Sequence, residues 1–164
     1  MHKVDDYVMY KKDVCKIREI RKNKINGNDY YILVPVDDES LVIETPVDNR
    51  MGFIREIISK KNAEKLIEEI PNIEPVNVIS NAYIDKVYKE LLYKGTYEDL
   101  IKIIKTAYLR NDERAKNKKK LSDKDSTYFN KAEKYLYNEL SISLGMNYNE
   151  TKEYVINKVQ ELIK

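Results

Sequence analysis

The stretch from Leu41 to Ser59 limits the fold most, because the periodicity of apolar residues changes across it. Before this stretch, short apolar runs with polar neighbours predict half-buried strands. Pro46 lacks an N–H, so a strand that reaches it must end there or run along a sheet edge. After the turn at Asp48-Asn49, three isoleucines begin a helical pattern: Ile54, Ile57 and Ile58. We therefore predict a β-rich part followed by an all-helical part.

Four strands are indicated in the first part. They are expected at 4–10, 14–20, 30–34 and 41–45. Lys16 and Arg18 interrupt the alternation of the second strand, which indicates a β-bulge. Asn26-Gly27 is the strongest hairpin signal, because a type I′ turn needs two residues that accept positive φ. So few short strands fit a small bent barrel of the SH3 or Tudor kind rather than a sandwich.

The second part shows repeated helix starts and stops. Ser59 and Ser80 are candidate N-caps, and Pro71 is expected to stop the first helix. Three further starts read as capping boxes: Thr96 with Asp99, Ser122 with Asp125, and Asn147 with Glu150. Gly95 and Gly145 fit the position just after a helix. Amphipathic helices with short connections predict a compact bundle.

The predicted fold class is therefore α+β, with a small Tudor/SH3-like β-barrel followed by an all-α helical bundle. We expect a barrel domain over residues 1–58, a helix and linker over 59–79, and a helical domain over 80–164. No apolar run approaches the ~20 residues of a membrane span, and no secretory segment is recognisable. A single cysteine cannot form an internal disulfide. A cytoplasmic monomer is the simplest expectation.

No usual catalytic constellation is recognisable, although carboxylates are abundant. The single histidine, His2, is close to the terminus, and Cys15 lies within an expected strand without a histidine base nearby in sequence. No Cys/His cluster has metal-ligand spacing, and no glycine-rich phosphate loop is present. We expect a binding protein that is not an enzyme and uses no cofactor, metal or small-molecule substrate.

A lysine run marks the region before the expected helix at Ser122. It comprises Lys116, Lys118, Lys119, Lys120 and Lys124. Ammonium groups beside a helix N-terminus favour a phosphate, so Lys119, Lys120 and Lys124 are candidate DNA contacts. Lys86 and Lys89 on the helix after the linker extend the set. A solvated loop without a ligand remains the alternative interpretation.

Several motifs together resemble the CarD/CdnL family of bacterial transcription regulators. They are VDDYVMY at 4–10, VCKIREI at 14–20, YYIL at 30–33, TPVDN at 45–49 and IREIIS at 54–59. ELLYKGTYEDL at 90–100, LS at 121–122 and NEL at 138–140 match more loosely. The resemblance covers nearly the whole chain.

The resemblance implies a Tudor-like domain that pairs a sheet edge with the β subunit of RNA polymerase. It also implies a helical domain that contacts promoter DNA upstream of the melted region and stabilises the open complex. Edge strands carry unpaired N–H and C=O groups that suit strand addition. The expected polymerase contacts lie near the hairpin and on the last strand: Arg21, Lys22, Ile25, Val42 and Glu44.

The sequence departs from the family pattern at three places. Lys11-Lys12-Asp13 replaces the Pro and Gly common after the first strand, and Glu44 stands where relatives carry Arg. Relatives also place a Trp wedge at the start of the second domain, whereas this chain has Asn81 and Tyr83 there and no Trp. We expect Asn81 and Tyr83 to contact DNA, with most of the binding directed at phosphates.

Two functions remain open at this point. The first is the regulator that binds polymerase and promoter DNA. The second is a protein–protein adaptor that uses the barrel edge and the bundle for two protein partners and does not bind DNA. Salt-dependent duplex binding separates them, because phosphate contacts release counterions.

Overall fold

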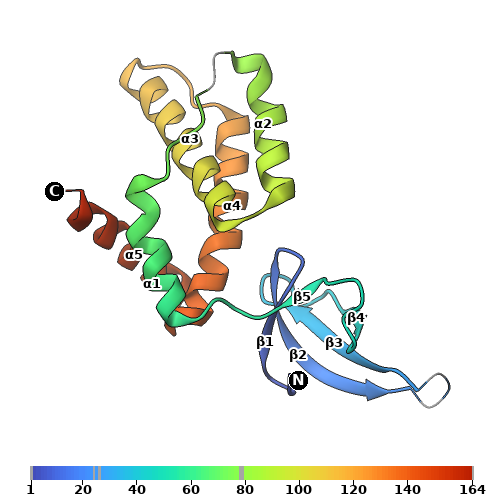
Figure 1. Cartoon of the computed structure of the whole chain (residues 1–164). Coiled ribbons are helices and arrows are strands. Elements are labelled where there is room, and N and C mark those ends of the chain that lie inside the picture. The colour runs from blue at the N-terminus through green and yellow to red at the C-terminus, as the bar shows by residue number, and fades with distance from the viewer. Residues whose placement is uncertain (1, 24, 26, 78–79, 164) are drawn as a thin grey trace. The chain divides into compact units, whose positions relative to one another are not determined.

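The computed structural model describes residues 2–23, 25, 27–77 and 80–163. It divides into two compact units, residues 1–59 and 60–164. In the described part, the first unit is a five-stranded antiparallel sheet that curls into a half-barrel, and the second is a set of five helices (Figure 1). The predicted α+β class with a small barrel and a helical bundle is confirmed. No helix among the described residues is long and apolar enough to cross a membrane.

The strands of the first unit follow the order β4-β3-β2-β1-β5. Their bounds are β1 Tyr7–Tyr10, β2 Asp13–Lys22, β3 Asp29–Pro35, β4 Ile43–Pro46 and β5 Ile54–Arg55. β2 and β3 form the longest pair and project as a hairpin arm (Figure 1). Of the Asn26-Gly27 turn, Asn26 lies outside the described residues, while Gly27 has the positive φ of 74° that the turn requires.

Alternating apolar residues of the strands build one core. Its buried members are Val8, Cys15, Ile17, Tyr31, Leu33 and Ile54. Arg18 has no partner in the β2–β3 register, because Ile17 pairs with Leu33 and Glu19 pairs with Ile32. The predicted bulge is thus confirmed, and it bends the sheet toward closure. Burial raises the pKa of the Cys15 thiol to about 12, as expected for a packed side chain.

One sequence expectation fails at the junction of the two parts. Ile54 was expected at the start of a helical pattern. It lies in β5 instead, where it pairs with Tyr10 of β1 and is buried in the sheet core. The helix begins only at Lys60. The isoleucine spacing was misleading because a two-residue strand is too short to show alternation.

The second unit contains α1 Lys60–Glu69, the short 3₁₀ turn η1 Ile70–Asn72, α2 Asn81–Lys94, α3 Tyr97–Lys116, α4 Asp123–Leu144 and α5 Tyr148–Leu162. Ser80, Thr96, Ser122 and Asn147 are the N-caps of α2 to α5, as predicted. Gly95 and Gly145 end α2 and α4 with left-handed φ.

The segment between α1 and α2 is held against α3. Lys105 Nζ donates to the carbonyl oxygens of Ile70 and Ile73, the latter at 2.6 Å, and Val76 N donates to Thr106 Oγ1 at 2.9 Å. Residues 59–79, expected to connect two domains, therefore pack largely with the helices. Val78 and Ile79 of this expected linker lie outside the described residues.

Candidate functional site

The first candidate surface is the outer edge of β4. Val47 N donates to Asp29 O at 3.0 Å, and register then places Thr45 and Ile43 opposite Tyr31 and Leu33. Because hydrogen-bonded and non-hydrogen-bonded pairs alternate in an antiparallel ladder, the backbone of Glu44 points away from β3. Pro46 also points outward, where its missing N–H costs no ladder bond.

At the opposite end of the sheet, the outer edge of β5 is occupied by a side chain. The Asn49 side chain donates from Nδ2 to Ile54 O at 2.9 Å and accepts from Ile54 N at 3.0 Å through Oδ1. Its amide thereby takes the place of a neighbouring strand along β5. Asn49 holds a left-handed φ of 51°, which asparagine tolerates better than most residues. The outward backbone groups of β5 at Ile54 are thus occupied.

The far half of β2 is a third stretch of edge. Asn23 N donates to Asn28 O at 3.2 Å, so alternation turns the backbone of Lys22 and Ile20 away from β3. β1 begins at Tyr7, which pairs with Lys16, and therefore does not cover this stretch. The bulge at Arg18 and the cations Arg21 and Lys22 are devices that discourage strand addition.

The five expected polymerase contacts are all exposed but lie on different stretches. Glu44 is on the β4 edge, and Val42, just before it, is 53% exposed. Arg21 and Lys22 are on the far half of β2, where Arg21 Nε contacts Glu19 Oε1 at 3.2 Å. Ile25 is in the hairpin loop, 98% exposed. The β4 pair is the part that suits strand addition.

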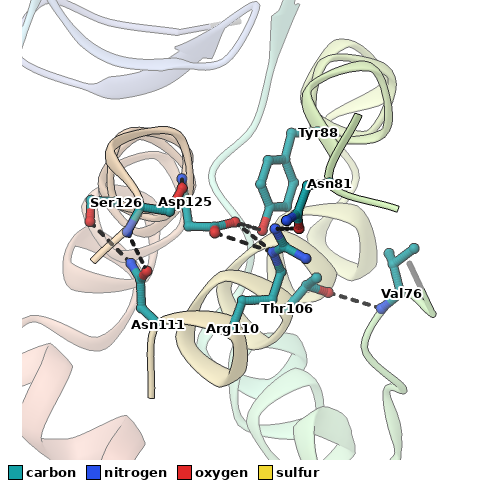
Figure 2. Close-up of polar contacts among 9 residues, drawn as sticks. Val76, Asn81, Tyr88, Thr106, Arg110, Asn111, Asp125 and Ser126 are labelled. Atoms are coloured by element: carbon teal, nitrogen blue, oxygen red, sulfur yellow. Dashed lines mark hydrogen bonds and ion pairs between the residues drawn. The ribbon is translucent and has the colours of Figure 1, made fainter. Parts of the chain in front are cut away.

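The second candidate surface is the junction of α2, α3 and α4. Arg110 Nε lies 3.1 and 3.2 Å from the two carboxylate oxygens of the fully buried Asp125, and its Nη2 donates to Asn81 Oδ1 at 2.7 Å (Figure 2). Tyr88 OH donates to the same carboxylate at 2.5 Å. Burial and this hydrogen bond raise the pKa of the Tyr88 hydroxyl. Asn81 is therefore anchored at the start of α2.

Asn81 and Lys119 border one polar hollow of about 270 Å³. Its other lining residues are Arg110, Glu113, Arg114 and Asn117. Two arginines at this hollow, Arg110 and Arg114, were missed by sequence reasoning. Their spacing of four residues on one helix face was the available signal.

A second group of lysines surrounds Asp85. Lys89 Nζ is 2.9 Å from Asp85 Oδ2, and Tyr128 OH donates to Asp85 Oδ1 at 3.2 Å. The hydrogen bond from Lys89 is the main cause that lowers the pKa of Asp85, and the charge of Lys124 contributes. Lys89 and Lys124 therefore share one acidic neighbour.

The remaining DNA candidates are not brought into these groups. Lys86 is two residues from both buried Ile84 and buried Tyr88, so it faces away from the bundle core. Tyr83, 65% exposed, lies nearly opposite Asp85 on α2. Lys120 is exposed beside Lys119, just before α4.

The first turn of α4 does not offer the phosphate site considered above. Asp123 and Asp125 place two carboxylates in that turn, and they already complement the helix dipole. The backbone N–H of Ser122 donates to Asn111 Oδ1 at 2.8 Å. Phosphate contact at this junction must therefore rely on the lysine and arginine side chains.

Comparison with models of known protein families and with curated proteins finds no match to this sequence. Among the described residues, no three His, Cys, Asp or Glu side chains gather as metal ligands.

Proposed function

We propose that this protein is a transcription regulator that binds the β subunit of RNA polymerase through the sheet unit and promoter DNA through the helical unit. The observation that carries the proposal is the outward β4 edge at Glu44, next to the exposed Val42, while Asn49 occupies the β5 edge at the other end of the sheet. The sequence motifs that resemble the CarD/CdnL family suggest the identity of the two partners.

Strand addition suits the β4 edge. A partner strand gains main-chain hydrogen bonds from outward backbone groups, and exposed side chains next to them supply specificity. Glu44 supplies the outward backbone groups and Val42, just before β4, an exposed apolar side chain; Pro46 then lacks the next outward donor. The added strand is therefore short, and the contact is modest by itself.

The helical unit supplies a second modest contact. Lys119 at the polar hollow, with Lys124 and Lys89 around Asp85, presents cations to backbone phosphates near the α2 and α4 N-termini. Tethering by polymerase raises the effective concentration of this weak DNA contact. Stabilisation of the open complex follows if the protein binds the melted promoter better than the closed one. The protein acts in the cytoplasm as a monomer and performs no catalysis.

The docking edge is tested by proline substitution in the full-length chain. Glu44→Pro removes the outward N–H of β4 and should abolish capture of purified bacterial RNA polymerase. Glu44→Ala keeps the backbone donor and should retain capture. Lys22→Pro is the matched control, because it removes an outward N–H from the β2 edge instead. Capture that survives Glu44→Pro and is lost with Lys22→Pro would move the docking edge to β2.

The DNA contact is tested by charge reversal. Changing Lys119, Lys120 and Lys124 together to Glu should weaken binding to a promoter duplex. The slope of log affinity against log salt concentration should become shallower by about 0.9 for each phosphate contact that is lost. Reversing Lys60, Lys61 and Lys65, exposed on α1, changes the net charge equally. Equal weakening by both triple variants would indicate a general charge effect and reject the junction as the DNA site.

A protein–protein adaptor is the second candidate function. It is favoured by the internal pairing of some cations, since Lys89 contacts Asp85 and Lys116 contacts Asp112 at 3.0 Å. Absence of duplex binding at low salt, with polymerase capture retained, would select the adaptor. A longer open-complex lifetime in the presence of the protein, lost in the junction variant, would select the regulator.

A further inference from the structure

The helical unit contains an apolar groove that the proposed function does not use. It has a cavity volume of about 490 Å³ and lies between α3, α4 and α5. Its apolar lining includes Ile101, Ile104, Phe129, Leu136, Val155 and Ile156. Binding sites for small molecules are typically lined by apolar side chains with a few polar groups and have volumes of roughly 300–1,000 Å³.

Apolar side chains remain exposed at this groove. Tyr108 and Ile156 both line the groove, and their exposed fractions are 60% and 42%. Covering such side chains removes apolar surface from water, which is favourable. The groove therefore favours a ligand with an apolar body.

Three charged groups also line the groove. The carboxylate of Glu133, 7% exposed, accepts from Lys152 Nζ at 2.9 Å and from Tyr148 OH at 3.4 Å. Lys105 Nζ donates to the carbonyl oxygens of Ile70 and Ile73. Among the residues that line the groove, two ammonium groups and one carboxylate leave a net charge of one positive unit, which Glu74 offsets in part from outside the lining. A monoanion neutralises that charge, whereas a cation adds to it.

Lys105 is the group best placed to receive an anion. An ammonium has three donor hydrogens, and the two carbonyl oxygens account for two of them. Burial lowers the pKa of Lys105 more than the negative charge of Glu74 raises it, so Glu74 compensates the buried ammonium only in part. A carboxylate at the third hydrogen would supply one.

We propose that the α3–α4–α5 groove binds a small amphiphile that carries one carboxylate. The apolar body lies along Ile104, Phe129 and Ile156, and the carboxylate accepts from Lys105 Nζ. The site is independent of polymerase and DNA binding, and its test involves neither partner.

Decanoate is a suitable probe, with decanol and decyltrimethylammonium as neutral and cationic counterparts. Titration calorimetry on the full chain, below micelle-forming concentrations, should give decanoate an affinity about tenfold higher than decanol and show least affinity for the cation. Equal affinity for decanoate and decanol, or no binding of decanoate, would overturn the proposal.

Two substitutions locate the site. Ile104→Trp fills the groove and should weaken decanoate binding at least tenfold, whereas Leu109→Trp, exposed on the same helix outside the groove, should leave it unchanged. Lys105→Arg should keep the preference for decanoate over decanol, and Lys105→Met should remove it. If Lys105→Met unfolds because two carbonyl oxygens lose their donor, the wild-type preference and Ile104→Trp still decide. Unchanged binding by Ile104→Trp would place the ligand elsewhere and reject the groove.

Discussion

Individual side chains decide which backbone groups of this protein are accessible. Asn49 occupies both outward groups of Ile54 with its own amide, and it does so from a left-handed backbone conformation. Asp-Asn before a glycine predicts a turn, and the chain does turn there. The closure of the β5 edge was not predictable, because it depends on where the turn places the amide in three dimensions.

We predict that Asn49→Gly destabilises the sheet unit by about 1–3 kcal/mol. Glycine accepts the positive φ, so the loss reports mainly the two hydrogen bonds to Ile54. Asn49→Ala should cost more, since alanine also adds left-handed strain. Urea unfolding monitored by sheet-specific amide exchange measures both. A stability of Asn49→Gly equal to that of the wild type would mean that water replaces the amide without cost.

The helices show how a local signal can be correct in position and incomplete in role. Thr96 with Asp99 and Asn147 with Glu150 form reciprocal capping boxes, as their spacing predicts. Ser122 accepts from Asp125 N, but the Asp125 carboxylate turns inward to Arg110 and Tyr88. Sequence spacing identified where α4 begins. It could not show that Asp125 joins three helices, because that requires knowing their packing.

We predict that Arg110→Met destabilises the helical unit by about 3–5 kcal/mol. It leaves the fully buried Asp125 carboxylate without its ion-pair partner. Arg114→Met, one turn further along α3, should change stability by less than about 0.5 kcal/mol, since Arg114 makes no ion pair within the described residues. Equal unfolding midpoints in urea for the two variants would show that Asp125 is protonated or solvated instead.

At the scale of the whole molecule, the two-part architecture was predictable because strand and helix periodicities are separated along the chain. The surfaces were less so. Glu44 was expected on a strand and lies on the edge strand β4, whereas Val42, expected on the same strand, lies just before it. Lys86 and Tyr83 face other directions than the lysines at the α2–α4 junction. Which face of a helix stays exposed depends on which other helices pack against it, and the sequence does not show that packing.

Both units should lose stability in alkali. Burial raises the pKa of the Cys15 thiol in the sheet unit, and burial or a hydrogen bond to Glu64 raises the pKa of Tyr137 and Tyr154 in the helical unit. A raised folded-state pKa favours the protonated form. The contribution of each such group to the free energy of unfolding is therefore complete below its unfolded-state pKa, about 8.5 for cysteine and 10 for tyrosine. It is lost as the pH rises further.

The urea midpoint should thus be nearly constant from about pH 7 to 8 and fall steeply above about pH 10. Tyr154→Phe removes one titrating group and the hydrogen bonds to Glu64, at 2.8 and 3.0 Å. It should lower the midpoint at neutral pH and make the alkaline decline shallower. An identical alkaline decline in this variant would exclude Tyr154 as a contributor.

The amide of Asn49 also bears on stoichiometry. A sheet whose first and last strands both accept newcomers can be extended repeatedly, copy after copy, into a fibre. In this sheet a strand can add at β4, but not at β5. There the side chain of Asn49 already bonds to the backbone of Ile54 and would first have to be displaced. Growth from the two ends of this sheet therefore stops after a single added strand, so one copy of the protein receives one partner strand.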